Sequence, residues 1–218
     1  MLDTKVQIGE KMMINIGVLV SGSGTNLLAI IEAIKAEQID GAIQIVISDK
    51  ADAFALRRAK FYKIETQSVN FKDYNNREEY DKKIVSKLKE KEIDLVVLAG
   101  YMKILSPYFI NEYKNKIMNI HPALLPSFPG LHAHKQALKY GVKISGCTVH
   151  FVDEGLDSGP IILQKAVKVK TGDTEGTLAE RILKEEHQIY PRAIQLFAQG
   201  RLKIEGRKVH IKGKAKIK

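Results

Sequence analysis

The stretch INIGVLVSGSGTNLLAIIEAIK, residues 14–35, starts as an apolar run and ends in a helical pattern. Its first part, INIGVLV, is rich in β-branched side chains, which are typical of a strand. Apolar residues then recur with helical spacing at Leu27, Leu28, Ile30, Ile31 and Ile34. The stretch therefore predicts a strand, a glycine-containing loop and a helix.

Strand and helix patterns go on alternating after this unit. The expected strands lie at 43–48, 65–69, 94–100 and 116–120; the expected helices begin at Asp49 or Asp52, span 76–91 and lie within 107–114. Strands that alternate with helices form a parallel sheet. The first 120 residues therefore predict an α/β fold.

The later part of the chain changes character. Two strand patterns, at 144–152 and 160–169, flank a turn-rich segment and are typical of an antiparallel pair. A long amphipathic helix pattern follows at about 174–198, and no repeat or linker separates the two parts. We therefore predict one α/β domain over residues 13–200, whose sheet is mostly parallel and gains an antiparallel extension. The flanking segments, 1–12 and 201–218, are expected to be a leader and a basic tail.

Composition excludes several classes of protein. Of the 218 residues, 44% are hydrophobic and 28% charged, which is ordinary globular usage and excludes long disorder. The single cysteine, Cys147, excludes an internal disulfide framework and suits a reducing compartment; its apolar strand context predicts a buried small side chain. No apolar run approaches the roughly 20 residues that span a bilayer, and residues 1–12 lack the apolar centre of a secretory signal. We expect a cytoplasmic protein with no membrane partner.

The net charge of +10 lies mostly at the C-terminus. Residues 201–218 contain eight Lys or Arg and one Glu, which gives +7 and leaves +3 for the remaining residues. A basic balance confined to a tail argues against a nucleic-acid partner and favours small-molecule substrates. Since no motif lies in this tail, its deletion is expected to leave turnover within a few-fold.

The sequence SGSGTN at 21–26 joins the first strand to the first helix. Glycines allow close backbone approach, and a helix N-terminus offers free amide hydrogens to an anion such as phosphate. No Gly-Lys-Ser/Thr follows, and Leu27 stands at the third glycine position of a dinucleotide fingerprint, so both of those motifs are excluded. The alternative is a plain tight turn in which Thr25 or Asn26 caps the helix.

A second group of polar residues lies where the strand at 116–120 meets the proline-rich loop 121–134. Asn119 and His121 share one strand face, where an amide and an imidazole could polarise a carbonyl and move a proton. A histidine that is merely hydrogen-bonded at a strand end is the alternative. The loop 153–160 holds three carboxylates, and one beside His121 would favour the imidazolium, although spacing alone does not choose which.

The loop histidines, His132 and His134, could share one side of an extended segment and bind a metal ion. No third ligand lies close to them in the sequence. We therefore expect no metal.

Four motifs stand in this order along the chain: SGSGTN at 21–26, LAGYMKILSP at 98–107, NIHPALLPSFPG at 119–130 and DEGLDSGP at 153–160. Together they resemble the motifs of the phosphoribosylglycinamide formyltransferases of purine synthesis. The resemblance covers about residues 14–198. It implies a Rossmann-like, mostly parallel sheet with helices on both faces, and a folate site near the antiparallel end.

The resemblance also implies an activity and a set of site residues. The activity is transfer of a formyl group from 10-formyltetrahydrofolate to the amine of N1-(5-phosphoribosyl)glycinamide in de novo purine (IMP) biosynthesis, with no metal and no covalent enzyme intermediate. The catalytic positions are Asn119, His121 and Asp157. The positions that match the phosphoribosylglycinamide site are Gly24, Thr25, Asn26, Leu183, Lys184, Glu185 and Glu186. The positions that match the folate site are Arg77, Met102, Lys103, Ile104, Leu105, Asn119, Asp153, Glu154, Gly155, Leu156 and Asp157.

Three other functions are weighed against this one. Methionyl-tRNA formyltransferases lack the SGSGTN loop and carry a further C-terminal domain. Formyltetrahydrofolate hydrolases resemble this sequence more closely, but add a regulatory domain before the catalytic one. A non-catalytic nucleotide- or RNA-binding module would leave the set of Asn119, His121 and Asp157 unexplained. The sequence leaves monomer and homodimer open.

Overall fold

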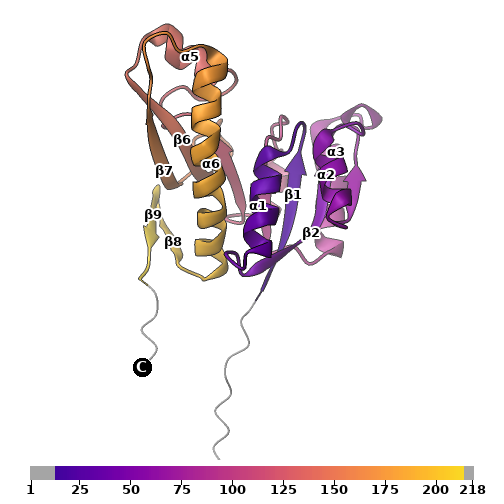
Figure 1. Cartoon of the computed structure of the whole chain (residues 1–218). Coiled ribbons are helices and arrows are strands. Elements are labelled where there is room, and N and C mark those ends of the chain that lie inside the picture. The colour runs from indigo at the N-terminus through magenta and orange to yellow at the C-terminus, as the bar shows by residue number, and fades with distance from the viewer. Residues whose placement is uncertain (1–12, 214–218) are drawn as a thin grey trace, which may run out of the picture.

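The computed structural model describes residues 13–213 (Figure 1). Their strands form one sheet in the order β3-β2-β1-β4-β5-β6-β7-β9-β8. The strands are β1 (Ile14–Val20), β2 (Gly41–Ser48), β3 (Thr66–Ser68), β4 (Leu95–Leu98), β5 (Ile117–His121), β6 (Ile144–Phe151), β7 (Ile161–Lys168), β8 (Leu202–Glu205) and β9 (Lys208–Ile211). The helices are α1 (Thr25–Lys35), α2 (Phe54–Phe61), α3 (Arg77–Glu90), α4 (Pro107–Glu112), α5 (Ala133–Tyr140) and α6 (Glu175–Ala198), with a 3-10 turn at Phe71–Asp73.

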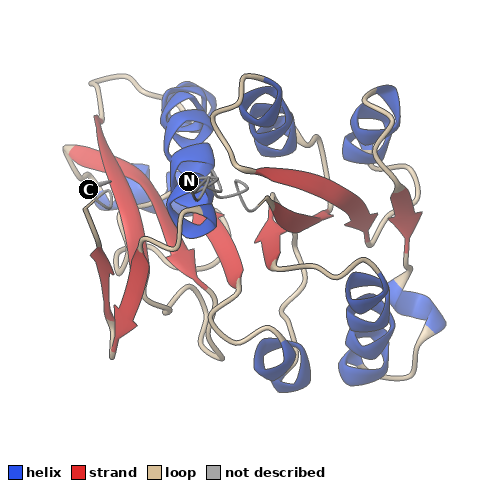
Figure 2. Ribbon diagram, turned by 90° about the horizontal axis from the view of Figure 1, so that it is seen from below, coloured by secondary structure: helices blue, strands red, loops and turns tan. Residues whose placement is uncertain are grey.

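Pairing along the sheet changes direction after β5. The strands β1 to β5 are parallel, whereas β6 pairs antiparallel with both β5 and β7. Helices pack on both faces (Figure 2), and each face has its own apolar core. One core includes residues of α1, α2 and α6, and the other includes residues of α3 and α4. The predicted mostly parallel sheet with an antiparallel extension is thereby confirmed.

One expected helix start is wrong, and the cap considered as an alternative for the first helix is not formed. The second helix begins at Phe54 after Ala53, with no side-chain cap, rather than at Asp49 or Asp52. Its early amide, that of Ala55, donates instead to the carbonyl of Gly22, so the β1–α1 loop fixes where α2 begins. The first helix follows Gly24, which has a left-handed conformation, so neither Thr25 nor Asn26 caps it.

The sheet continues past residue 200. Residues 202–211, assigned from the sequence to a basic tail, form the hairpin of β8 and β9, and β9 pairs with β7 at Ile161 and Lys208. Leu202, Ile204 and Val209 of this hairpin pack against the core that contains α6. The tail therefore belongs in part to the folded structure; the leader 1–12 and residues 214–218 lie outside the described residues.

The strand order decides where polar loops meet. In the order β3-β2-β1-β4-β5, connections leave β1 and β4 in opposite directions along the sheet, and ligands of such sheets bind at the carboxyl ends of the strands near this switch. The β1–α1 loop, the segment after β4 and the end of β5 all lie at this edge. Among residues 13–213, no helix is long and apolar enough to cross a membrane.

Candidate active site

The β1–α1 loop presents a helix N-terminus whose first amides are free of helical bonds. The first bond of α1 runs from the amide of Leu28 to the carbonyl of Gly24, so the amides of Thr25 and Asn26 have no acceptor within the helix. Gly24 has φ +72°, and a Cβ there would stand 2.6 Å from the Cβ of Ala55. Close contact with α2 therefore requires glycine, and the loop can hold an anion through backbone amides.

Arg58 of α2 is a cation that sequence reasoning missed. Its Nε donates to the carbonyl of Ser23 at 2.9 Å, and its guanidinium lies over the ring of Phe54. This places a positive charge beside the loop, where it adds to the helix dipole. The sequence holds no signal for it, because the contact depends on how α2 packs beside α1.

Helix α6, late in the chain, contacts the same loop. Asn26 Nδ2 donates to Glu186 Oε2 of α6 at 2.8 Å, and both side chains are buried. Burial raises the pKa of the Glu186 carboxyl, and the bond from Asn26 only partly opposes this. Of the other predicted residues nearby, Lys184 is exposed and Glu185 lies 4.0 Å from Lys165. Glu186 is therefore the residue of this group in contact with the loop.

The raised pKa makes Glu186 a source of pH-dependent stability. The folded state binds its proton more tightly than the unfolded state, so this contribution is present below about pH 4 and is lost as pH rises through the folded pKa. We expect Glu186→Gln to raise the unfolding midpoint by about 2–4 °C at pH 8, since a shift of that size corresponds to about 1 kcal/mol in a chain of this length.

Thermal unfolding of the wild type and the variant between pH 4 and 8 measures this effect. The gain should disappear near pH 4, and the exposed Glu180→Gln should show no such trend. A Glu186→Gln protein that is less stable than the wild type at pH 8 would contradict the account.

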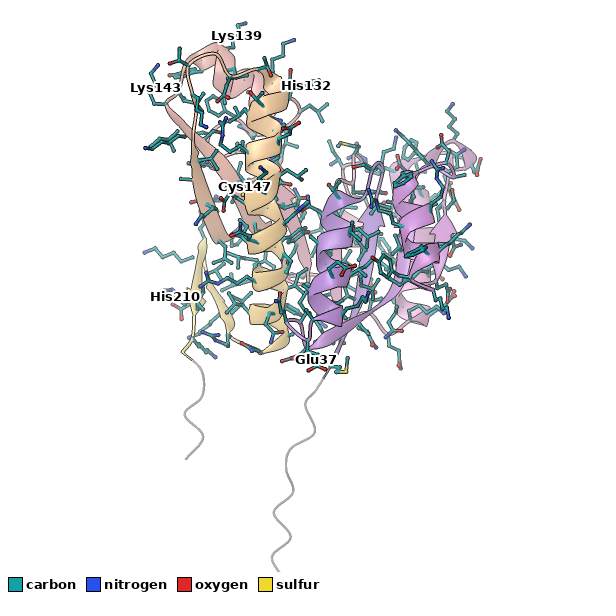
Figure 3. All side chains as sticks on the ribbon, viewed as in Figure 1. Glu37, His132, Lys139, Lys143, Cys147 and His210 are labelled. Carbon is teal, nitrogen blue, oxygen red and sulfur yellow. The ribbon has the colours of Figure 1, made fainter. Side chains whose placement is uncertain are left out.

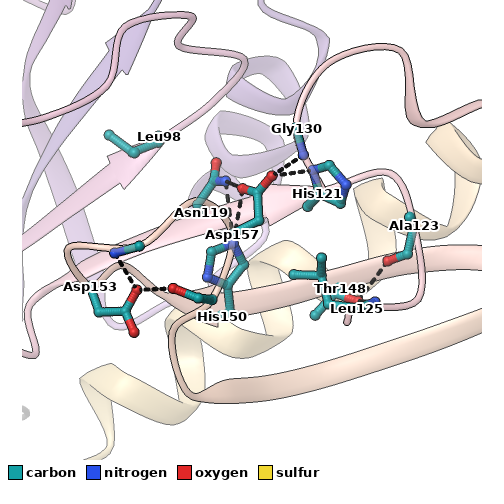
Figure 4. Close-up of polar contacts among 12 residues, drawn as sticks. Leu98, Asn119, His121, Ala123, Leu125, Gly130, Thr148, His150, Asp153 and Asp157 are labelled. Carbon is teal, nitrogen blue, oxygen red and sulfur yellow. Dashed lines mark hydrogen bonds and ion pairs between the residues drawn. The ribbon is translucent and has the colours of Figure 1, made fainter. Parts of the chain in front are cut away.

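The three predicted catalytic side chains lie together at the end of β5 (Figure 4). His121 Nδ1 is 3.2 Å from Asp157 Oδ2, and Asn119 Nδ2 is 3.4 Å from Asp157 Oδ1. Asp157 also accepts the amide of Gly130 at 2.8 Å. The tertiary structure therefore brings the acid loop after β6 onto the polar face of β5.

His121 has an oxygen acceptor at each ring nitrogen. Its Nδ1 faces the Asp157 carboxylate, and its Nε2 lies 2.8 Å from the carbonyl oxygen of Phe128. Neither oxygen can donate, so both contacts are hydrogen bonds only when both nitrogens carry hydrogen. The surroundings therefore offer an acceptor to each ring nitrogen that carries a hydrogen.

His150 of β6 is a fourth member that sequence reasoning missed. It pairs directly with Asn119 across the antiparallel ladder, and its Nε2 is 3.3 Å from Asn119 Nδ2. Burial lowers the pKa of His150, and its Nδ1 faces the carbonyl of Phe151, so the neutral ring donates from Nδ1 and accepts at Nε2. Strand alternation alone could not reveal this, because it does not give the register between β5 and β6.

Hydrogen bonds fix the loops on both sides of this cluster. Asp153 Oδ1 accepts from Ser158 Oγ and from the amide of Gly155. Asp157, which lies between Gly155 and Ser158 in the sequence, has φ +49°. A left-handed aspartate is uncommon and needs such support. After β5, Thr148 Oγ1 donates to the carbonyl of Ala123 (Figure 4). The site is thus held by β6 and by its own loop.

Among the positions matched to folate, some side chains are apolar and exposed, and others are buried or have a partner within the protein. Met102, Ile104 and Leu156 are apolar yet 58–64% exposed, as expected of side chains that meet an apolar ligand. Leu105 is buried, and the ammonium of Lys103 lies 4.0 Å from Asp49 and over the ring of Phe71, so these side chains have partners within the protein.

The remaining folate positions are polar or lack a side chain. Arg77 begins α3 and lines a cavity of about 550 Å³ with Lys82, Ser106 and Pro107. Glu154 and Gly155 are exposed, whereas Asp153 is committed to its own loop. A ligand would therefore meet Arg77 and the exposed part of the acid loop.

The residues considered for metal or thiol chemistry lie at the start of α5 and on β6. Within residues 13–213, no group of three or more His, Cys, Asp or Glu is placed to hold a metal ion. His132 and His134 fall at the start of α5 rather than on an extended segment, which corrects the expected geometry. Cys147 of β6 (labelled in Figure 3) is buried, and burial raises the pKa of its thiol to about 12.

Known proteins are similar over most of the chain. A phosphoribosylglycinamide formyltransferase of Escherichia coli is 48% identical over 190 residues, which cover 87% of this chain and 90% of that protein. A human trifunctional purine biosynthetic protein is 49% identical over 89% of this chain, which spans 19% of its length. A glycinamide ribonucleotide transformylase structure from Symbiobacterium toebii has 52% identity and a TM-score of 0.91, covering 92% of this chain and 95% of that one.

A formyltetrahydrofolate deformylase of Pseudomonas syringae has the same fold with less sequence in common. It is 28% identical with a TM-score of 0.86, over 93% of this chain and 67% of that one. Residues 14–194 match the family described as formyl transferase, which is most of the chain. The protein therefore belongs to the formyl transferase family.

Proposed function

We propose that this protein transfers the formyl group of 10-formyltetrahydrofolate to the amine of phosphoribosylglycinamide, in the cytoplasm, as a step of de novo purine biosynthesis. The observation that carries the proposal is that an anion-binding loop and the group of Asn119, His121 and Asp157 lie at the same sheet edge. The phosphoribosylglycinamide formyltransferases similar to this chain support the same reaction. Residues 13–200 with the following hairpin form the proposed catalytic domain.

His121 and Asn119 act on the formyl oxygen. When the amine attacks the formyl carbon, negative charge develops on that oxygen, and preorganised donors stabilise it. The bond from the formyl carbon to the folate nitrogen then breaks, the amine loses a proton, and the departing folate nitrogen takes one up. For His121 to donate, one of its two acceptors must be exchanged for substrate. The Phe128 carbonyl is neutral whereas Asp157 is charged, so we assign Nε2 to the substrate and Nδ1 to Asp157. The contacts of Asn119 Nδ2 are 3.3 and 3.4 Å long, so this amide can also turn a hydrogen to the oxygen.

The two substrates would bind next to this group, each at its own set of residues. The phosphate of the ribotide suits the amides of Thr25 and Asn26 and the cation of Arg58. Glu186 lies beside them, bonded to the side chain of Asn26. The exposed apolar side chains of Met102 and Ile104 suit the folate ring. We propose the remaining matched residues as contacts in the same two sets.

A direct assay separates this function from the alternatives. Purified protein is mixed with 10-formyltetrahydrofolate, with and without phosphoribosylglycinamide, and both tetrahydrofolate and formylated ribotide are measured. We expect equal amounts of the two products with the amine and almost no reaction without it. Release of formate without the amine would instead identify a hydrolase, and absence of either reaction would identify a binding protein.

Gly24 tests the assignment of the anion loop. We expect Gly24→Ala to raise the KM for the ribotide by about tenfold or more, because the added Cβ would meet Ala55 at 2.6 Å and displace the loop amides. The KM for the folate should change by less than about threefold. Gly22→Ala is the matched control, since a Cβ at Gly22 meets nothing within 4 Å. An equal rise in both KM values would remove the loop from the ribotide site.

A further inference from the structure

Two adjacent residues of α3 hold the two ends of the segment that follows β4. The hydroxyl of Tyr80 lies 2.9 Å from that of Tyr101, and Asp81 Oδ2 accepts the amide of Ser106 at 2.6 Å. Tyr80 is fully buried and Asp81 is 1% exposed. The segment 101–106 is thus hydrogen-bonded at both ends to neighbouring residues of α3.

Burying the carboxylate of Asp81 costs free energy of folding, so its position calls for an explanation. Carboxylates are rarely this buried unless they are paired, because burial disfavours the charge. Burial raises the pKa of Asp81, while hydrogen bonds from Ser106 and the positive charge of Arg77 oppose that shift. Ser106 in turn caps α4 by accepting the amide of Phe109. Asp81 therefore fixes the end of the segment and the start of α4 together.

Between these two hydrogen bonds, the segment presents apolar side chains to solvent. Its only bond to the β1–α1 loop that involves a side chain is from the amide of Met102 to Ser21 Oγ, at 2.9 Å. Leu105 points into the core, whereas Met102 and Ile104 are 64% and 58% exposed. Without its ends fixed, so short an irregular segment would gain conformational entropy by sampling many conformations, and its exposed side chains would not be held at one place.

The same helix turn connects this segment to Arg77. Arg77 and Asp81 are four residues apart on α3 and so lie on one face, and the charge of Arg77 acts on Asp81. Arg77 and Ser106 line the same cavity of about 550 Å³. The distance between the cation of α3 and the apolar segment is therefore set through Asp81.

We infer that Asp81 is a positioning residue for the folate co-substrate: through Ser106 it holds the segment 102–105 at a fixed place relative to Arg77. The inference rests on the proposed function. Asp81 itself touches no substrate. Its removal should weaken folate binding while leaving the ribotide site and the catalytic group at the end of β5 intact.

The test compares two substitutions that differ in whether they can hold Ser106. Asp81→Ala removes the acceptor, and we expect it to raise the KM for 10-formyltetrahydrofolate and the Kd for tetrahydrofolate by about tenfold or more. The KM for the ribotide, and kcat at saturation, should change by less than about threefold. Asp81→Asn keeps an acceptor for the amide of Ser106 and should return the folate constants to within about threefold of the wild type.

A destabilised protein needs a matched control. Asp94 accepts the amide of Asn15 at 2.8 Å at the amino-terminal end of the sheet, away from the site. Asp94→Ala should lower the unfolding midpoint without changing either folate constant. If Asp81→Ala does not fold, Asp81→Ser, which leaves a smaller cavity and is too short to reach Ser106, replaces it.

The outcomes separate the two claims. If the wild type transfers formyl groups and a folded Asp81→Ala protein keeps the wild-type Kd for tetrahydrofolate, the inference about Asp81 is wrong and the proposed function stands. Equal increases in the folate and ribotide KM values would show a general structural role and would also overturn it. If the wild type binds tetrahydrofolate but transfers no formyl group, the proposed function fails, and the Kd of the variants still tests Asp81.

Discussion

Replacing His121 with alanine should lower kcat by about 10²- to 10⁴-fold, which is the usual contribution of a positioned acid or base. Both ring nitrogens of His121 face oxygen acceptors, so each can act as a hydrogen-bond donor when it carries hydrogen. That donor stabilises the oxyanion mainly in the transition state, so the KM for each substrate should change by less than about threefold. Steady-state kinetics with each substrate varied in turn measures all three constants.

Asp157→Asn tests how the acid works. The substitution removes the carboxylate that faces Nδ1 and orients the ring, so we expect kcat to fall by about 10²-fold. His150 and Asn119 also contact this carboxylate, so the loss of kcat reports the cluster rather than one group.

The double variant separates coupled from independent roles. In the His121→Ala background, Asp157→Asn should cost less than about tenfold, because the carboxylate has no imidazole left to orient. The remaining loss reflects the contacts of Asp157 with Gly130 and Asn119. If Asp157→Asn costs the same in both backgrounds, the acid acts directly on substrate or water, and its role through His121 must be abandoned.

Deleting residues 201–218 should lower the unfolding midpoint by about 6–12 °C. The deletion removes three half-buried apolar side chains from the core, each of which contributes roughly 1 kcal/mol, and leaves β7 as an unpaired edge. The charge pattern alone predicts only weaker adsorption to polyanions and a few-fold change in turnover. The hairpin is part of the sheet, so the structure adds a loss of stability to that expectation.

The hairpin also contacts the acid loop. Arg207 Nη2 donates to the carbonyl of Ser158 at 2.7 Å, next to Asp157. We therefore expect Arg207→Ala to lower kcat by a few-fold without a change in midpoint comparable to that of the full deletion. Deletion of residues 214–218 alone removes three lysines and keeps the hairpin, so it separates charge from structure. A full deletion that unfolds at the wild-type temperature would contradict the account.

Local sequence was sufficient for most of the elements, whereas the candidate catalytic residues were named by the family resemblance. The βα alternation and the strand patterns at 14–20 and 144–152 predicted which strands and helices follow one another along the chain, because hydrophobic periodicity is a local property. The resemblance named Asn119, His121 and Asp157, which the structure places within hydrogen-bonding distance of one another. Helix starts were less predictable: α2 begins where the carbonyl of Gly22 accepts an amide, not at an acidic residue.

Tertiary structure alone decided which distant residues meet. The register of β5 against β6 puts His150 opposite Asn119, the packing of α2 puts Arg58 beside Ser23, and α6 brings Glu186 to Asn26. Each contact joins residues between 31 and 160 positions apart, and its formation depends on how whole elements pack. Periodicity and charge in the sequence describe one element at a time, so they predict the faces of helices and strands but not the partners of those faces.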